Sequence, residues 1–175
     1  SRAHSDLLTK FLSQKEVNPE TLTWLFQEMC LLSIQLIEVD TASVWLYSDD
    51  KKHLECKALF KGESLSFELG QKINVLEYPD YFEALPEQRV IVDVNVESNP
   101  LTKAFKEGKH TGSPKSLIHV SVWCAGKVEG VFSLEHMSGF RDWTHAEIQY
   151  ALALNDLMTL GLEGWKKQQA EAMVE

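Results

Sequence analysis

Cysteine is scarce in this sequence, and its spacing excludes a disulfide framework. Cys30, Cys56 and Cys124 are odd in number and lie far apart along the chain. Small secreted domains that depend on disulfides carry even, closely spaced sets of cysteines. The pattern therefore predicts a reducing, cytoplasmic location in which the three cysteines are small core residues.

Long apolar runs and clusters of positive charge are missing as well. No window of about 18 residues is apolar, and the N-terminus lacks the charged-then-apolar arrangement of a secretion signal. The formal net charge is -9 and the basic residues do not cluster, so a phosphate backbone would be repelled. We expect a soluble protein that has neither a membrane nor a nucleic acid as its partner.

Familiar catalytic and metal-binding motifs do not occur. The sequence contains no His-x-His, Cys-x-x-Cys, His-Glu-x-x-His or Walker loop, and no nucleophile can be paired with a base. We therefore predict a domain that is not itself an enzyme and that holds no metal. A longer parent protein could still be a signalling enzyme.

What the sequence does contain is typical of one globular domain. Its 175 residues are 44% hydrophobic and 25% charged, enough for one contiguous core. Because it begins with Ser1 and ends on a polar, helix-prone run, we expect a piece of a longer polypeptide. We divide it into a helical flank over residues 1–18, a domain over 19–164 and a helical linker toward an output domain over 165–175.

Three segments show the spacing of amphipathic helices. The first, at residues 5–15, carries four apolar side chains at helical spacing. The second has Asn18 as N-cap and Pro19 at its first position, and it runs to about Glu38. The third begins at a capping box formed by Thr144 and Glu147 and runs nearly to the end of the chain.

Two segments alternate with the period of a β-strand before the middle of the chain. Residues 42–47 and 53–60 are joined by turn chemistry at 48–52, which predicts a hairpin. In the second strand we expect one side to be lined by Leu54, Cys56, Ala58 and Phe60.

The middle third gives weaker signals. We expect a strand near 71–75, a short helix that carries Tyr78, Tyr81, Phe82 and Leu85, and a strand at 90–92. A further short helix would be capped by Asn99, start at Pro100 and end at Gly108. We expect a mobile loop at residues 109–114.

Alternation returns from Lys115 to His136 and is interrupted at residues 124–126. A two-residue turn would force Ala125 to positive φ, so we predict a three-residue loop with only Gly126 there. The pairs would be Val122 with Val128, Val120 with Gly130 and Ile118 with Phe132. This hairpin would have one aliphatic face and one mixed face, the latter formed by Leu117, His119, Ser121, Trp123, Ser133 and Glu135.

The order of these elements predicts an α+β fold. One antiparallel sheet would have the N- and C-terminal helices on its aliphatic face, and the short helices and loops of the middle third would form a pocket on the other. Over residues 22–163 the sequence resembles the GAF family. The resemblance rests on the ordered set Tyr78, Pro79, Asp80, Tyr81, Phe82, Leu85, Ile91, Asp93, Asn99, Pro100, Ser116, Leu117, Gly126, Lys127, Val128, Glu129, Gly130, Val131, Leu134, Glu135, His136, Arg141, Asp142, Trp143 and Thr144.

The resemblance implies a sensory input domain that controls an output domain such as a histidine kinase or a diguanylate cyclase. It does not imply a particular ligand. Cyclic-nucleotide-binding members carry an Asp-Glu pair where Phe140 is followed here by Thr144 and His145. Bilin-binding members need a cysteine beside the pocket, and none occurs between Cys56 and Cys124. We see no haem motif either.

Candidate ligand-binding residues lie on the mixed face and in the middle third. The aromatic ones could instead close a second small core, Asp93 could simply cap the following turn, and His119 could be a satisfied structural histidine. The full set is Trp45, Tyr78, Tyr81, Phe82, Asp93, Phe105, Ser116, His119, Ser121 and Ser133. A separate structural network of Glu135, His136, Arg141 and Trp143 would pin the loop before the last helix.

The last helix also shows a heptad seam, formed by Ala151, Asn155, Met158, Leu162, Trp165, Gln169 and Ala172. Up to Leu162 it fits an intramolecular face, and beyond Trp165 it could begin a dimeric linker. Three functions follow: a small-molecule sensor that acts as a homodimer through its terminal helices, a ligand-free dimerisation module, and an enzyme like the free methionine sulfoxide reductases, with Cys124 as nucleophile.

Overall fold

The computed structural model describes residues 18–65, 70–103 and 113–174. The predicted helix at 5–15 and most of the predicted loop at 109–114 lie outside the described residues, as do Phe105 and Gly108. Within the described ranges, no helix combines the length and hydropathy that crossing a bilayer requires.

The first described helix, α2 (Pro19–Ile37), begins as its sequence predicts. The Asn18 side chain accepts a hydrogen bond from the Thr21 backbone N–H at 2.9 Å, and the Thr21 hydroxyl accepts one from the Asn18 N–H at 2.9 Å. These two bonds satisfy backbone donors that the first turn would otherwise leave free. The helix ends at Glu38, which adopts a left-handed conformation.

All strand pairs are antiparallel, which confirms the predicted sheet. The sheet has the order β3-β2-β1-β7-β6-β5, and β4 pairs with β2 off this path. Its strands are β1 (Thr41–Tyr47), β2 (His53–Lys61), β3 (Ser64–Leu65), β4 (Lys72–Asn74), β5 (Val90–Asp93), β6 (Ser116–Cys124) and β7 (Lys127–His136).

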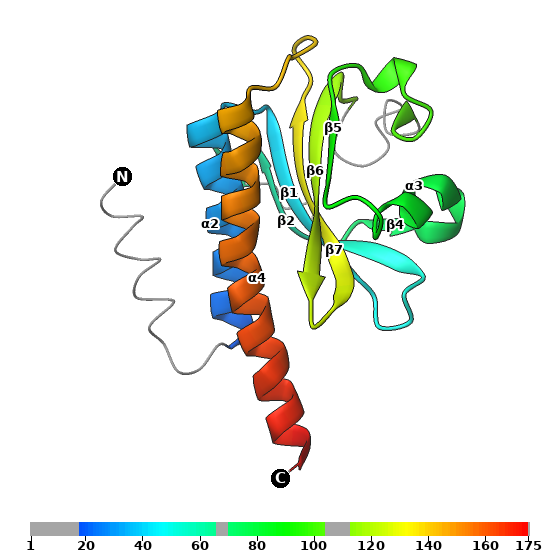
Figure 1. Cartoon of the computed structure of the whole chain (residues 1–175). Coiled ribbons are helices and arrows are strands. Elements are labelled where there is room, and N and C mark those ends of the chain that lie inside the picture. Colours follow the sequence, from blue (N-terminus) through cyan, green and yellow to red (C-terminus); the bar gives the residue numbers. More distant parts are fainter. Residues whose placement is uncertain (1–17, 66–69, 104–112, 175) are drawn as a thin grey trace.

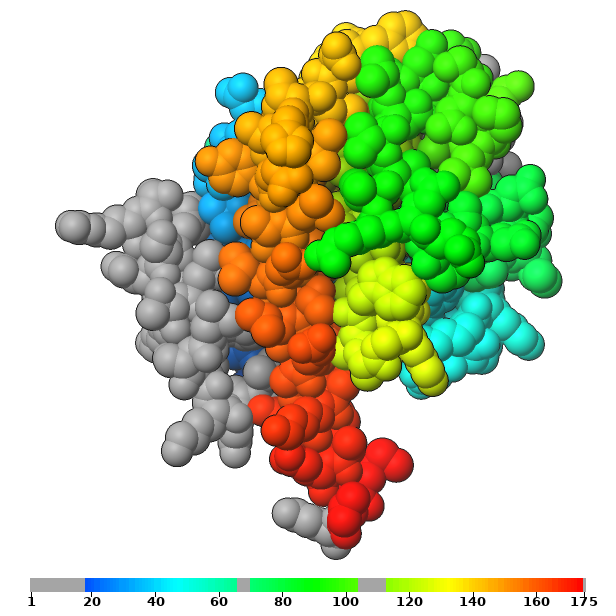
Figure 2. All heavy atoms as spheres, in the orientation of Figure 1, coloured from blue at the N-terminus to red at the C-terminus, as the bar shows by residue number. Residues whose placement is uncertain are grey.

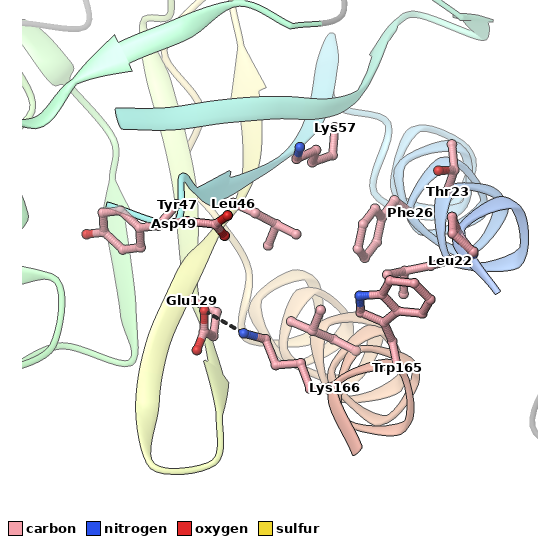
Figure 3. A pocket seen from close by; sticks show the side chains of 12 residues that line it. Leu22, Thr23, Phe26, Leu46, Tyr47, Asp49, Lys57, Glu129, Trp165 and Lys166 are labelled. Atoms are coloured by element: carbon pink, nitrogen blue, oxygen red, sulfur yellow. Dashed lines mark ion pairs between the residues drawn. The ribbon is translucent and has the colours of Figure 1, made fainter. Parts of the chain in front are cut away.

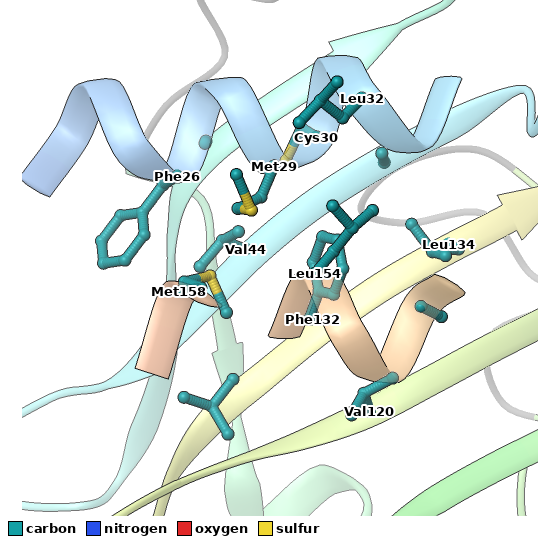
Figure 4. Packing of buried hydrophobic residues seen from close by; sticks show 14 of the residues in the cluster. Phe26, Met29, Cys30, Leu32, Val44, Val120, Phe132, Leu134, Leu154 and Met158 are labelled. Carbon is teal, nitrogen blue, oxygen red and sulfur yellow. The ribbon is translucent and has the colours of Figure 1, made fainter. Parts of the chain in front are cut away.

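The two long helices cover one face of this sheet. In Figure 1, α2 and α4 (His145–Val174) lie side by side against it, and α4 begins at the predicted capping box of Thr144 and Glu147. Between helices and strands lies the main core, where Met29, Phe132 and Met158 are fully buried (Figure 4). Ile118, Val120 and Val122 also point into this core, so the aliphatic face of β6 is confirmed.

The opposite face, which we call the mixed face, carries the short elements of the middle third. These are η1 (Val75–Glu77), α3 (Pro79–Ala84) and η2 (Val96–Ser98), with α3 visible on the far side of the sheet in Figure 1. A second hydrophobic cluster lies beneath them and includes Leu59, Leu85 and Leu117. The predicted helix after Asn99 is replaced over residues 100–102 by a turn, in which the Asn99 side chain accepts from the Leu101 N–H.

Two β-bulges correct the predicted strand faces. In β2, Val44 pairs with Ala58 but Trp45 pairs with Cys56, so Lys57 is an extra residue. Leu54 and Cys56 therefore lie in the second cluster while Ala58 and Phe60 lie in the main core. The predicted single row of these four residues is wrong, because a bulge shifts the alternation by one.

The β6–β7 hairpin has a two-residue loop, so the predicted three-residue loop is wrong. Cys124 pairs with Lys127, and both Ala125 (φ 53°) and Gly126 (φ 77°) are left-handed, as in a type I′ turn. Every predicted pair is shifted: Val122 faces Gly130, Val120 faces Phe132 and Ile118 faces Leu134. Because that shift is two residues, the predicted faces survive.

Ala125→Asn is expected to stabilise the protein by about 1 kcal/mol, because asparagine tolerates the left-handed region that costs alanine about this much. The Ala125 side chain is exposed, so no packing is lost. Urea unfolding followed by circular dichroism measures the change. The reverse strain, Gly126→Ala, should destabilise by a similar amount, and an Ala125→Asn variant no more stable than the wild type would contradict the turn geometry.

The last turns of α4 extend past the rest of the domain. The helix has 30 residues, or about 45 Å, and its last deeply buried residue is Leu162. Residues 169–174 are exposed and project away from the body of the molecule in Figure 2. Asn155 of the predicted seam is buried and donates from Nδ2 to the Ser121 carbonyl at 3.4 Å, so this part of the seam is intramolecular.

Candidate functional site

A chain of four buried polar side chains, which we call the polar chain, crosses the mixed face. The Tyr81 hydroxyl of α3 lies 2.7 Å from Nδ1 of His119, and Nε2 of His119 lies 2.9 Å from the Ser133 hydroxyl. Ser133 in turn donates to the Glu135 carboxylate at 3.2 Å. His119 and Ser133 meet because they are paired residues of β6 and β7. All four side chains are less than 5% exposed.

The hydrogen bonds of the polar chain define the tautomer of His119. Since the Ser133 proton is directed to Glu135, Nε2–H of His119 donates to the Ser133 oxygen, and Nδ1 accepts from the Tyr81 hydroxyl. Burial lowers the pKa of His119 from 6.5 to about 3 and raises that of Tyr81 well above 10. Both side chains are therefore neutral at physiological pH, and the chain of donors ends on a carboxylate.

The aromatic candidates pack with one another. Tyr81 and Phe82 meet edge to face at 5.1 Å between ring centroids, and Trp45 is buried in the same second cluster, with Tyr78 packed against it. Phe82 also contributes to the wall of a shallow apolar hollow of about 440 Å³ that Trp123 shares. The aromatic residues therefore build the second core, and Phe82 borders open space.

Three other candidates make contacts that hold the backbone. Both Asp93 carboxylate oxygens are used, one by the Asn95 N–H at 3.0 Å and the other by the Thr102 hydroxyl. Ser116 donates to the Val94 carbonyl, and Ser121 to that of Arg89. Asp93 therefore acts as the turn cap that the sequence left open as its alternative role, and Phe105 lies outside the described residues.

The predicted loop network forms with three of its four members. The Arg141 guanidinium lies over the Trp143 ring at 4.6 Å and pairs with Glu147 of α4, and the Trp143 indole donates to the Asp93 carbonyl. The His136 ring packs edge to face on Trp143 at 6.4 Å. Glu135 is not part of this network, because strand alternation turns its carboxylate to the mixed face and Ser133.

Sequence reasoning missed a groove on the helix side of the sheet. It encloses about 330 Å³ between the start of α2, the last part of α4 and the strands (Figure 3). Phe26 and Trp165 form its apolar side, and Lys57, Glu129 and Lys166 form its charged side. Lys57 and Glu129 are the extra residues of two bulges, and no sequence signal locates a bulge.

Comparison with known proteins gives structural likeness only. No family model matches the sequence, and no relative is found among curated proteins. The phycocyanobilin-bound GAF domain of a cyanobacterial phytochrome matches with a TM-score of 0.74 and 14% identity, over 94% of this chain and 96% of that one. The PixJ GAF domain of Thermosynechococcus elongatus matches with a TM-score of 0.67 and 16% identity, over 89% and 91%.

The chain has the GAF fold. A methyl-accepting chemotaxis protein, over its residues 122 to 287, matches with a TM-score of 0.71 and 11% identity, covering 93% of this chain and 96% of that one. These identities are low, so the likeness of this GAF fold to its neighbours lies in the course of the backbone. The resemblance noted in the sequence therefore holds for the fold.

The remaining cysteine of interest in this GAF domain is Cys124. Its side chain is buried, and burial raises the pKa of its thiol; nearby Lys166 lowers it, while Glu163 and Glu129 raise it further. A catalytic cysteine needs an accessible thiolate and therefore a lowered pKa. The environment of Cys124 is that of a structural residue.

Proposed function

We propose that this chain is a non-catalytic sensory GAF domain, over residues 19–164, that binds a small molecule on its mixed face. The observation that carries the proposal is the buried polar chain of Tyr81, His119, Ser133 and Glu135. Buried polar groups cost free energy unless each is paired, and a core without ligand would be simpler to build from aliphatic residues. The named neighbours include a photoreceptor and a chemotaxis protein, which supports a sensory role.

The polar chain has a direct mechanical connection to the terminal helices. His119 lies between Ile118 and Val120 in β6, and these two neighbours point into the core beneath α2 and α4. A ligand that displaces His119 therefore displaces the surface on which the helices pack. Residues 165–175 would carry this change as a linker into an output domain such as a histidine kinase or a diguanylate cyclase.

A ligand is expected to raise the Tm of the protein, and differential scanning fluorimetry with nucleotide, amino acid, aromatic and bilin panels measures the rise. At about ten times its Kd a ligand should add about 3 °C. Ser133→Ala, which interrupts the polar chain, should abolish this shift. Ser121→Ala is the matched control on the same face and should keep it.

Bilins form a separate arm of this experiment, because several structural neighbours hold them. Residues 57–123 contain no cysteine, so biliverdin should not become covalently attached. Denaturing gels stained with zinc reveal attached bilin. A well-folded sample that responds to none of the panels, or a Ser133→Ala variant that responds like the wild type, would contradict ligand binding at the polar chain.

The second candidate function is a ligand-free homodimerisation module. It is favoured by three large apolar side chains that α2 and α4 expose, Leu36 at 52%, Tyr150 at 50% and Leu160 at 55%. Such residues are a normal component of helix-to-helix interfaces. Light scattering on a polypeptide that continues past Glu175 separates the two candidates, since a monomer at high concentration would leave only the sensor.

A further inference from the structure

We propose that the groove between α2, α4 and the sheet is a second binding site, which takes an α-amino acid with an apolar side chain. The site is distinct from the polar chain, because the two lie on opposite faces of the sheet. Its volume of about 330 Å³ is at the small end of ligand pockets, which suits a ligand of amino-acid size.

The charged side of the groove is built by two bulges that flank β1. Lys57 is the extra residue where β2 pairs with Val44 and Trp45, and Glu129 is the extra residue of β7 where Trp123 pairs with Val128. Bulges commonly redirect side chains beside functional sites. Simple alternation from Ser133 and Val131 would place Glu129 on the mixed face, but it lies on the helix side and contacts Lys166 of α4 at 3.0 Å.

The polar groups of the groove present both signs of charge. Glu129 is held by Lys166 at 3.0 Å and by Lys51 at 3.2 Å, and Lys57 is held by Glu55 at 3.2 Å. Asp49 also borders the groove, and no described residue pairs with its carboxylate. A zwitterion matches this arrangement: its carboxylate accepts from Lys57 and Lys166 while its ammonium donates to Asp49.

The opposite side of the groove is apolar and holds the side chain of the ligand. Leu22 and Phe26 of α2 face Trp165 of α4 across it, and Leu46 of β1 lies behind them (Figure 3). Trp165 is only partly buried, so it has surface left to cover. An aromatic or branched aliphatic side chain would complete this cluster by removing apolar surface from water.

Occupation of the groove would affect the point where α4 leaves the domain. The ion pair between Lys166 and Glu129 ties the helix to the sheet just beyond Leu162, the last deeply buried residue of α4. A ligand carboxylate that engages Lys166 competes with Glu129 for it. The site would therefore adjust how firmly the last turns of α4 are held.

Isothermal titration calorimetry with L-phenylalanine and L-leucine, up to about 10 mM, tests the proposal. We expect both to bind, and we expect phenethylamine and 3-phenylpropionate, which each lack one charge, to bind at least about ten-fold more weakly. Absence of binding by both amino acids would overturn the proposal. Equal binding of either singly charged analogue would overturn the zwitterion assignment.

Variants assign the binding to this groove. Lys57→Met should weaken L-phenylalanine at least about ten-fold, whereas Lys61→Met, an exposed lysine of the same strand outside the groove, should not. Ser133→Ala should leave this binding unchanged, which keeps the test separate from that of the polar chain. Binding that survives Lys57→Met but is lost in Ser133→Ala would place the amino acid on the mixed face and overturn the groove.

Discussion

Replacing Gly130 with alanine is expected to destabilise the protein by about 3 kcal/mol, because the new methyl group would collide with backbone. A Cβ atom at this position would lie 1.9 Å from the Trp45 carbonyl oxygen and 2.9 Å from Cα of Leu46. Gly130 belongs to β7, which pairs with β1 on one side and β6 on the other. Neither neighbour can retreat without breaking the ladder on its far side.

Urea denaturation of the two proteins measures this effect. Gly139→Ala is the matched control, since nothing lies within 4 Å of the position that its Cβ would take. It should change the free energy of unfolding by less than about 0.5 kcal/mol. If Gly130→Ala unfolds at the same urea concentration as the wild type, then the close approach of β1 and β7 is not as described.

Acidification is expected to reveal the second large effect, through His119. The ring titrates near 6.5 in the unfolded chain but near 3 in the native protein, because burial penalises its charged form. Between these values the unfolded state binds a proton that the native state does not. Stability is therefore complete above pH 6.5 and falls as the pH is lowered, by about 3 kcal/mol between pH 7 and pH 4.5.

His119→Gln should remove this part of the pH dependence, since glutamine can hydrogen-bond but does not titrate. The variant is expected to start less stable at pH 7 and to lose about 3 kcal/mol less than the wild type on acidification. His145→Gln, at an exposed position, is the control and should follow the wild type. Equal slopes for His119→Gln and the wild type would mean that His119 is protonated in the native state.

Local pattern was sufficient wherever a short segment determines its own structure. Asn18 with Pro19, and Thr144 with Glu147, identified the starts of α2 and α4, because a cap is a contact between residues three positions apart. Alternation likewise gave both faces of β6, including His119 on the mixed face.

Register and side-chain partners could not be derived in this way. The prediction for the β6–β7 loop assumed that alanine avoids positive φ, yet Ala125 adopts 53° because the pairing of two long strands outweighs a cost of about 1 kcal/mol. The bulges at Lys57 and Glu129 arise from how three strands fit together, and no single segment encodes that fit.

The sequence by itself determined the α+β class, the helix starts and the two unlike faces of the sheet, since each depends on residues close together in the chain. Only the tertiary structure decided that Tyr81, His119, Ser133 and Glu135 form one polar chain, and that Glu129 reaches Lys166 instead of the mixed face. Such contacts join residues far apart in sequence, and their geometry follows from packing, which has no local signature.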